Sequence, residues 1–193
     1  HAQCEAMVKS VKERFGTIDC LVNNAGITRD GLMARMPEEQ YDLVIAVNQK
    51  SVFNMTKFAG NVMMRQRSGK IINLASVAGL YGNPGQINYS ASKGAVIAMT
   101  KTAAKELGSR GVNVNAVAPS FIKTPLVEKQ IPEQAASLGI TEEEVVKNIM
   151  LRDTVDGVFT TVEDVANTLV FLSKDQGALT GQSLRLTHGW AMM

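Results

Sequence analysis

Short apolar runs alternate with longer amphipathic segments along this chain, and this alternation restricts the possible folds more than any other feature. Strands are expected at 19–22, 70–75, 112–117 and 183–186. Helices are expected at 4–15, 37–67, 89–107 and from 161 onward. Strands that alternate with helices form βαβ units around a parallel sheet. We therefore predict an α/β fold with a doubly wound, mostly parallel sheet.

The composition indicates a single soluble domain. Of the 193 residues, 45% are hydrophobic and 20% are charged, so we expect one domain over residues 1–193. The net charge of +2 comes from scattered residues and predicts no nucleic-acid partner. No apolar run approaches the roughly 18 residues needed to cross a bilayer, so no membrane partner is expected. Cys4 and Cys20 cannot form a disulfide scaffold, which favours the cytoplasm, and no metal-ligand spacing is present.

In open parallel sheets, ligands bind beyond the carboxyl ends of the strands. Three strand ends are therefore of interest. The first is followed by 23–26 (Asn-Asn-Ala-Gly), the second by Ser76 and the third by Pro119. Between Ser76 and the next helix lies a glycine-rich stretch, 79–85, which we expect to be a loop.

Tyr89 and Lys93 are four residues apart at the start of a predicted helix, so they share one helix face. A phenol normally titrates near pH 10, and a nearby cation lowers that pKa. Together with the Ser76 hydroxyl, the pair could hold one substrate oxygen and exchange a proton with it. Asn48 lies inside the preceding helix, where a buried amide needs hydrogen-bonding partners.

These motifs, in this order and spacing, resemble the short-chain dehydrogenase/reductases over essentially the whole chain. The resemblance implies a Rossmann-like oxidoreductase that moves a hydride between NAD or NADP and a carbonyl/alcohol pair. It implies that the catalytic residues are Asn48, Ser76, Tyr89 and Lys93. It implies cofactor contacts from Asn24, Ala25, Gly26, Tyr89, Lys93, Pro119, Ile122 and Thr124. It also implies a homotetramer in which the two long helices pair between subunits.

Two departures from the family pattern stand out. Ser120 follows Pro119 where the family has glycine, and its Cβ should narrow the pocket or demand another backbone angle. The glycine-rich phosphate loop and the first strand–helix units of the family do not occur in this sequence. We therefore expect the sequence to be incomplete at its N-terminus.

Two subfamilies compete for the substrate. The stretch 26–30 and the loop before Tyr89 resemble 3-oxoacyl-[acyl-carrier-protein] reductases. The region 123–157, expected to form a substrate lid, resembles bacterial 3-hydroxybutyrate dehydrogenases. We give the resemblance of the lid more weight than that of the other two segments. We therefore expect 3-hydroxybutyrate or acetoacetate as the substrate, bound by Ser76, Gln86 and Gln130. The alternatives are an NADPH-dependent 3-oxoacyl-[acyl-carrier-protein] reductase and, in another class, a truncated non-catalytic subunit or interaction module.

Overall fold

The computed structural model describes residues 1–175, 177–190 and 192, without the side chains at 126 and 137. The predicted domain covers 1–193, so its positions 176, 191 and 193 lie outside the described residues. Within the described part, no helix is both long enough and apolar enough to span a bilayer.

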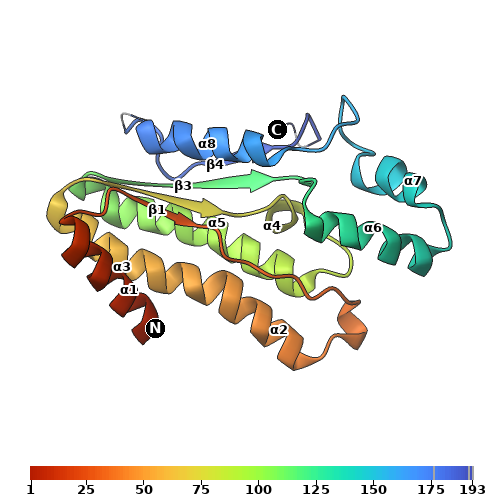
Figure 1. Cartoon of the computed structure of the whole chain (residues 1–193), viewed down its shortest axis with the longest axis horizontal. Helices are drawn as coiled ribbons and strands as arrows, with labels where there is room; N and C mark the ends of the chain where they lie inside the picture. Colours follow the sequence, from red (N-terminus) through yellow and green to blue (C-terminus); the bar gives the residue numbers. More distant parts are fainter. Residues whose placement is uncertain (176, 191, 193) are drawn as a thin grey trace.

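A parallel four-stranded sheet forms the centre of the molecule (Figure 1). Its strands lie side by side in chain order: β1 (Cys20–Asn23), β2 (Gly69–Leu74), β3 (Val112–Pro119) and β4 (Ser183–Leu186). Each strand was predicted within two residues of its observed bounds, and the predicted α/β class with a parallel sheet is confirmed.

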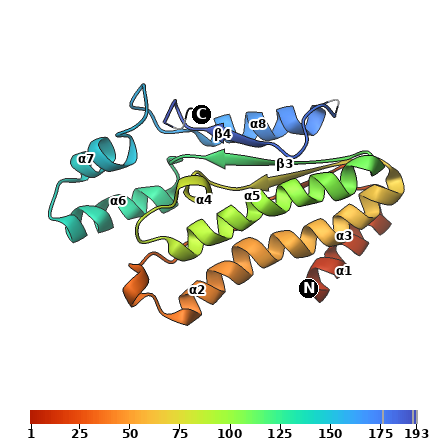
Figure 2. The ribbon, with the colours of Figure 1, turned by 180° about the vertical axis from the view of Figure 1, so that it is seen from behind.

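Helices cover both faces of the sheet (Figures 1 and 2). One face carries α1 (Ala2–Phe15), α3 (Ser51–Gln66) and α5 (Ile87–Leu107). The other face carries α8 (Val162–Lys174). The remaining helical segments are η1 (Met33–Arg35), α2 (Glu38–Val44), η2 (Ile45–Lys50), α4 (Ala78–Tyr81), η3 (Gly108–Arg110), α6 (Pro125–Leu138), α7 (Glu142–Val145) and η4 (Val146–Met150).

Both faces of the two central strands are buried, and most of their side chains are apolar. Ile71 and Val114 face the cluster built from α1, α3 and α5. Ile72 and Val117 point to the opposite side and pack with residues of α8. The successive apolar residues of these strands therefore serve two separate cores.

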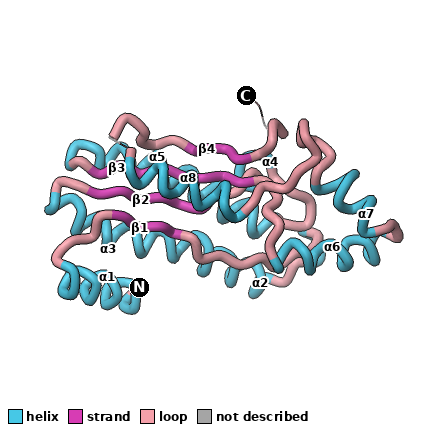
Figure 3. Tube along the Cα trace, turned by 45° about the horizontal axis from the view of Figure 1, so that its top comes forward, coloured by secondary structure: helices cyan, strands magenta, loops and turns pink. Residues whose placement is uncertain are grey.

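The connection from β3 to β4 has the opposite hand to the two connections before it. The strands follow one another in one direction across the sheet, yet α3 and α5 lie on one face and α8 on the other (Figure 3). Crossovers between parallel strands are right-handed as a rule, so this last connection is an exception to it. The path through α6 and α7, beyond the carboxyl ends of the strands, lets the chain change face before it returns.

The helix predicted over 37–67 is continuous but contains a π-helical turn, η2, between α2 and α3. The stretch 79–85 is not wholly a loop, because its first residues belong to the single turn α4. Gly79 allows this turn to lie directly on α5. A Cβ at Gly79 would lie 2.5 Å from the backbone carbon of Lys93 and 2.6 Å from the nitrogen of Gly94.

The predicted lid, 123–157, contains α6, α7 and η4 and lies beyond the carboxyl ends of the strands (Figure 1). It has a small apolar cluster of its own, formed by Val127, Ala135, Val145 and Met150. The lid is therefore a packed unit that stands beside the sheet rather than on it.

The close approach of α4 to α5 gives a first prediction. Gly79→Ala should lower the free energy of unfolding by about 1–3 kcal/mol, because the added methyl group overlaps the backbone of α5. Denaturation in urea measures this. Gly31→Ala is the matched control, because a Cβ there meets nothing within 4 Å, and it should leave stability unchanged. Equal stability of the two variants would contradict the close packing.

Candidate active site

Two adjoining cavities lie at the carboxyl ends of the strands. The smaller has a volume of ≈ 180 Å³ and the larger ≈ 390 Å³. Five residues line both cavities: Thr28, Ser76, Tyr89, Ser120 and Ile122. The two residues that we expect to hold the reacting oxygen therefore stand where the cavities meet.

Tyr89, in the first turn of α5, lies close to the side chain of Ser76, which follows β2, and both line the two cavities. Ser76 is held in place because its Oγ accepts a hydrogen bond from the backbone nitrogen of Ala78 at 3.2 Å. Burial raises the pKa of Tyr89 above its usual value, the Ser76 side chain opposes that rise, and the negative charge of Asp30 adds to it.

Lys93 lies one turn further along α5 and is only 4% exposed. Its Nζ is 5.6 Å from the centre of the Tyr89 ring and donates a hydrogen bond of 2.6 Å to the carbonyl of Leu74. Burial lowers the pKa of Lys93 to about 8. The lowered tyrosine pKa that we expected from Lys93 is not found in this arrangement, because the ammonium is directed at a strand carbonyl and burial of the phenol dominates.

Asn48 is fully buried in the π-helical turn and does not line either cavity. Its Oδ1 accepts from the backbone nitrogen of Ile27 at 2.8 Å, and its Nδ2 donates to the Ile27 carbonyl at 2.9 Å. Nδ2 also lies 3.2 Å from the Oγ of Ser92 on α5. The structure therefore places Asn48 behind the site, where it holds the loop after β1 against α5.

Most of the predicted cofactor contacts line the smaller cavity: Asn24, Gly26, Tyr89, Lys93, Pro119 and Ile122. Ala25 lies beside them in the chain but does not line it. Thr124 lines the larger cavity, where its side chain caps α6 by accepting from the backbone nitrogen of Val127.

The predicted substrate residues Gln86 and Gln130 both line the larger cavity. Both side-chain amides donate to Asp30, a residue that the sequence analysis did not select. Gln86 Nε2 lies 3.1 and 3.0 Å from the two carboxylate oxygens, and Gln130 Nε2 lies 3.0 Å from Oδ2. No cluster of three His, Cys, Asp or Glu that could hold a metal ion occurs among the described residues.

Comparison with known proteins identifies the family. The family model for short chain dehydrogenases matches residues 1–135. The chain belongs to this family. A 3-oxoacyl-[acyl-carrier-protein] reductase FabG of Thermotoga maritima is 49% identical over 97% of this chain and 72% of that relative. A FabG of Staphylococcus aureus is 46% identical over 98% of this chain and 73% of its own length.

The solved structures agree. Sorbitol-6-phosphate 2-dehydrogenase SrlD of Erwinia amylovora superimposes with a TM-score of 0.94 at 30% identity, over 100% of this chain and 76% of that one. The Rossmann-like fold is therefore confirmed. As a short-chain dehydrogenase, the chain is an NAD(P)-dependent oxidoreductase that acts on CH–OH or keto groups.

The residues of this short-chain dehydrogenase fit the nicotinamide ribose end of such a cofactor. Gly26 leaves space beside Lys93, because a Cβ there would lie 3.7 Å from Lys93 Nζ. An ammonium has three N–H donors, and among the described residues Lys93 donates only to Leu74. Two donors therefore remain for hydroxyl groups in the smaller cavity.

Ser120 stands where the short-chain dehydrogenase family has glycine, and it does not adopt the left-handed backbone that glycine favours: among the described non-glycine residues only Arg67 and His188 have a positive φ. The Ser120 nitrogen donates to the Leu186 carbonyl at 2.9 Å, and its Oγ lies 3.2 Å from Thr160 Oγ1.

Several lining residues of the larger cavity were not predicted: Phe121, Val127, Ile149, Asp153 and Trp190. Phe121 follows β3, and the others come from the lid and from the segment after β4. Trp190 is the single tryptophan of the chain, and this rarity was the one available hint.

The buried ammonium of Lys93 gives a prediction on pH. Between pH 8 and 10.5 the unfolded chain keeps a proton on Lys93 that the folded chain has released, so this group makes stability rise with pH. The free energy of unfolding of the wild type, minus that of Lys93→Met, should therefore increase by about 1–2 kcal/mol from about pH 7.5 to about pH 9.5.

Urea denaturation at both pH values measures the difference. The control is Lys101→Met, because Lys101 is exposed on the same helix. It should keep the pH dependence of the wild type. If the difference in free energy of unfolding between wild type and Lys93→Met stayed constant over this pH range, burial would not lower the pKa of Lys93.

Proposed function

We propose that this short-chain dehydrogenase is a 3-oxoacyl-[acyl-carrier-protein] reductase. The observation that carries the proposal is the 46–49% identity to FabG proteins over nearly the whole chain. The sorbitol-6-phosphate dehydrogenase is less similar, at 30% identity. These relatives favour the reductase over the 3-hydroxybutyrate dehydrogenase that we had preferred from the lid sequence.

In the proposed reduction, Tyr89 donates its proton to the substrate oxygen, which Ser76 holds by a second hydrogen bond. A nicotinamide cofactor held in the smaller cavity would supply the hydride. Lys93 faces the smaller cavity, where its free N–H donors can hold ribose hydroxyls beside Tyr89. Asn48 acts as a positioning residue, because it fixes the loop that carries Gly26 and Ile27.

The larger cavity suits an acyl chain. Much of its lining is apolar: Val77, Ala78, Phe121, Val127, Ile149 and Trp190. Since it meets the smaller cavity at Ser76 and Tyr89, a chain bound there would present its 3-oxo group at that junction.

A comparison of two substrates tests the assignment. Acetoacetyl thioester with NADPH is expected to be reduced efficiently, whereas 3-hydroxybutyrate with NAD should react poorly. Efficient oxidation of 3-hydroxybutyrate without thioester reduction would support the dehydrogenase alternative. The oxidation of NADPH, or the formation of NADH, is followed by absorbance.

Tyr89→Phe tests the proton donor. The substitution removes the hydroxyl alone, so the reduction rate should fall by about 10³-fold while the far-UV circular dichroism spectrum is retained. Tyr41→Phe is the matched control, because Tyr41 is exposed on α2 and lines neither cavity. A Tyr89→Phe variant with normal turnover would mean that another group supplies the proton.

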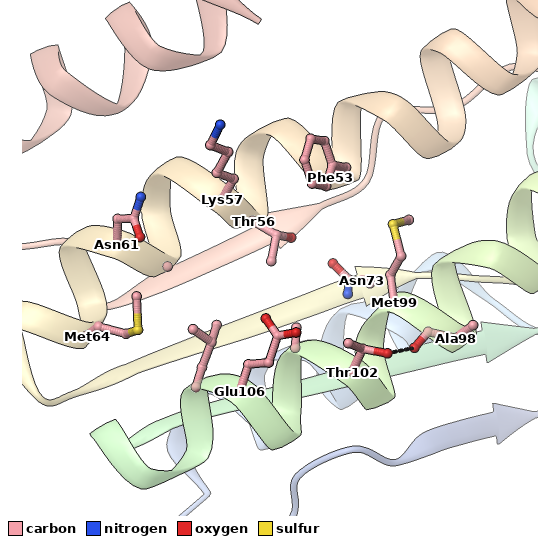
Figure 4. A pocket seen from close by; sticks show the side chains of 13 residues that line it. Phe53, Thr56, Lys57, Asn61, Met64, Asn73, Ala98, Met99, Thr102 and Glu106 are labelled. Carbon is pink, nitrogen blue, oxygen red and sulfur yellow. Dashed lines mark hydrogen bonds between the residues drawn. The ribbon is translucent and has the colours of Figure 1, made fainter.

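We also propose a cytoplasmic homotetramer in which α3 and α5 pair between subunits. A groove of ≈ 460 Å³ runs between these two helices (Figure 4). Phe53, Met64 and Met99 line it together with the small residues Gly60, Ala98 and Ala103. Phe53 on α3 is 52% exposed, and Ala98 on α5 is exposed as well. A second copy on this groove would bury that apolar surface.

A charge placed in the groove tests this assembly. Phe53→Glu should disrupt the pairing of α3 and α5, since a charged side chain would replace an apolar ring that the second copy is proposed to cover. Light scattering should then show a smaller assembly than for the wild type. Phe15→Glu is the control, because Phe15 is 66% exposed at the end of α1 and lies outside the groove. Wild-type assembly by both variants would place the interface elsewhere.

A further inference from the structure

Asp30 holds the two amides that a substrate carboxylate would otherwise use. It is an exposed residue of the loop after β1 and does not itself line a cavity, but its two partners line the larger one. Gln86, just before α5, and Gln130, on α6 of the lid, both donate to it. Both oxygens of Asp30 act as acceptors, which suits an ionised carboxylate.

The orientation of the Gln86 amide is itself fixed. Its Oε1 accepts from Asn83 Nδ2 at 2.8 Å, so its NH₂ group faces Asp30. The loop that carries Asp30 is also held, because the Gly31 nitrogen donates to the Gly85 carbonyl at 2.8 Å and Asn88 Nδ2 donates to the Arg29 carbonyl at 2.9 Å. The arrangement around Asp30 is therefore supported from several sides.

The larger cavity offers a carboxylate no cation. Among the described residues that line it, none is Lys, Arg or His, and the one carboxylate is Asp153, which pairs with Arg152 at 3.5 Å. No ion pair to Asp30 is found among the described residues. The neighbouring Arg29 donates to the carbonyl of Thr28 instead.

The charge of Asp30 acts on the reaction centre, because it adds to the rise in the pKa of Tyr89 that burial causes. Burial and the charge of Glu133 on α6 raise the pKa of Asp30, and the hydrogen bonds from Gln86 and Gln130 oppose that rise by favouring the ionised carboxylate. Lys93, the one buried cation among the described residues, faces the smaller cavity and the carbonyl of Leu74.

We propose that Asp30 is a specificity-determining residue that excludes free 3-oxo acids and admits only acyl groups whose carboxyl is uncharged, as in a thioester. It does so by its negative charge and by occupying the amides of Gln86 and Gln130. This inference rests on the proposed function and extends it, because it names the group that separates a thioester from the free acid. The hydroxybutyrate alternative would need these amides for the substrate.

The test compares acetoacetate with its neutral N-acetylcysteamine thioester, using NADPH and full kinetics for each. The wild type should favour the thioester strongly in kcat/KM. Asp30→Asn keeps the shape of the side chain but removes its charge. The ratio of kcat/KM for the thioester to kcat/KM for acetoacetate should then fall by about tenfold or more, because KM for acetoacetate decreases. Asp30→Ala also releases the amides of Gln86 and Gln130, so this ratio should fall further.

Asp42→Asn is the matched control, because Asp42 is an exposed aspartate on α2 whose side chain, unlike that of Asp30, is not the acceptor of the Gln86 and Gln130 amides. It should keep the wild-type preference. Thioester reduction with an unchanged preference in Asp30→Asn and Asp30→Ala would overturn the role of Asp30 and leave the proposed function standing. A wild type that reduces neither substrate would overturn the proposed function and this inference with it.

Discussion

The hydrogen bond from the buried ammonium of Lys93 to the carbonyl of Leu74 joins α5 to the last residue of β2. Because Ser76 follows that strand and Tyr89 lies one turn before Lys93, this single contact brings the proposed reacting groups to one place. Burying an ammonium is costly unless it is hydrogen-bonded. The bond to Leu74 therefore offsets part of the cost of the burial that lowers the pKa of Lys93. Gly79 makes the approach possible, since no side chain fits between α4 and α5.

The division into two cavities follows from the same geometry. Parallel strands end at one edge of the sheet, so the loops after β1, β2 and β3 meet there. The smaller cavity contains Lys93, and the larger one adds apolar residues of the lid and of the C-terminal segment, such as Val127 and Trp190. Ser76 and Tyr89 belong to both, so the proposed reaction takes place where a cofactor and an acyl group can touch.

Local sequence predicted local structure well. Thr161 and Asp164 form a reciprocal capping box at the start of α8, as their spacing indicates. Strands were predicted from short apolar runs, and Tyr89 and Lys93 from their four-residue spacing. The π-helical turn around Asn48 and the single turn α4 were not predicted, because each depends on packing against α5 rather than on the propensity of its own residues. Asp30 escaped notice for the same reason, since its partners Gln86 and Gln130 are 56 and 100 residues away.

The sequence by itself determined the α/β class, the strand positions and the family motifs, because these follow from periodicity and from residues close together in the chain. Only the tertiary structure decided which face α8 covers, where Asn48 and Thr124 lie, and which group holds the amides of the larger cavity. These outcomes depend on contacts between distant segments, and such contacts are set by the packing of whole elements. A glutamine that a motif assigns to substrate binding can thus turn out to be hydrogen-bonded to a carboxylate of the protein itself.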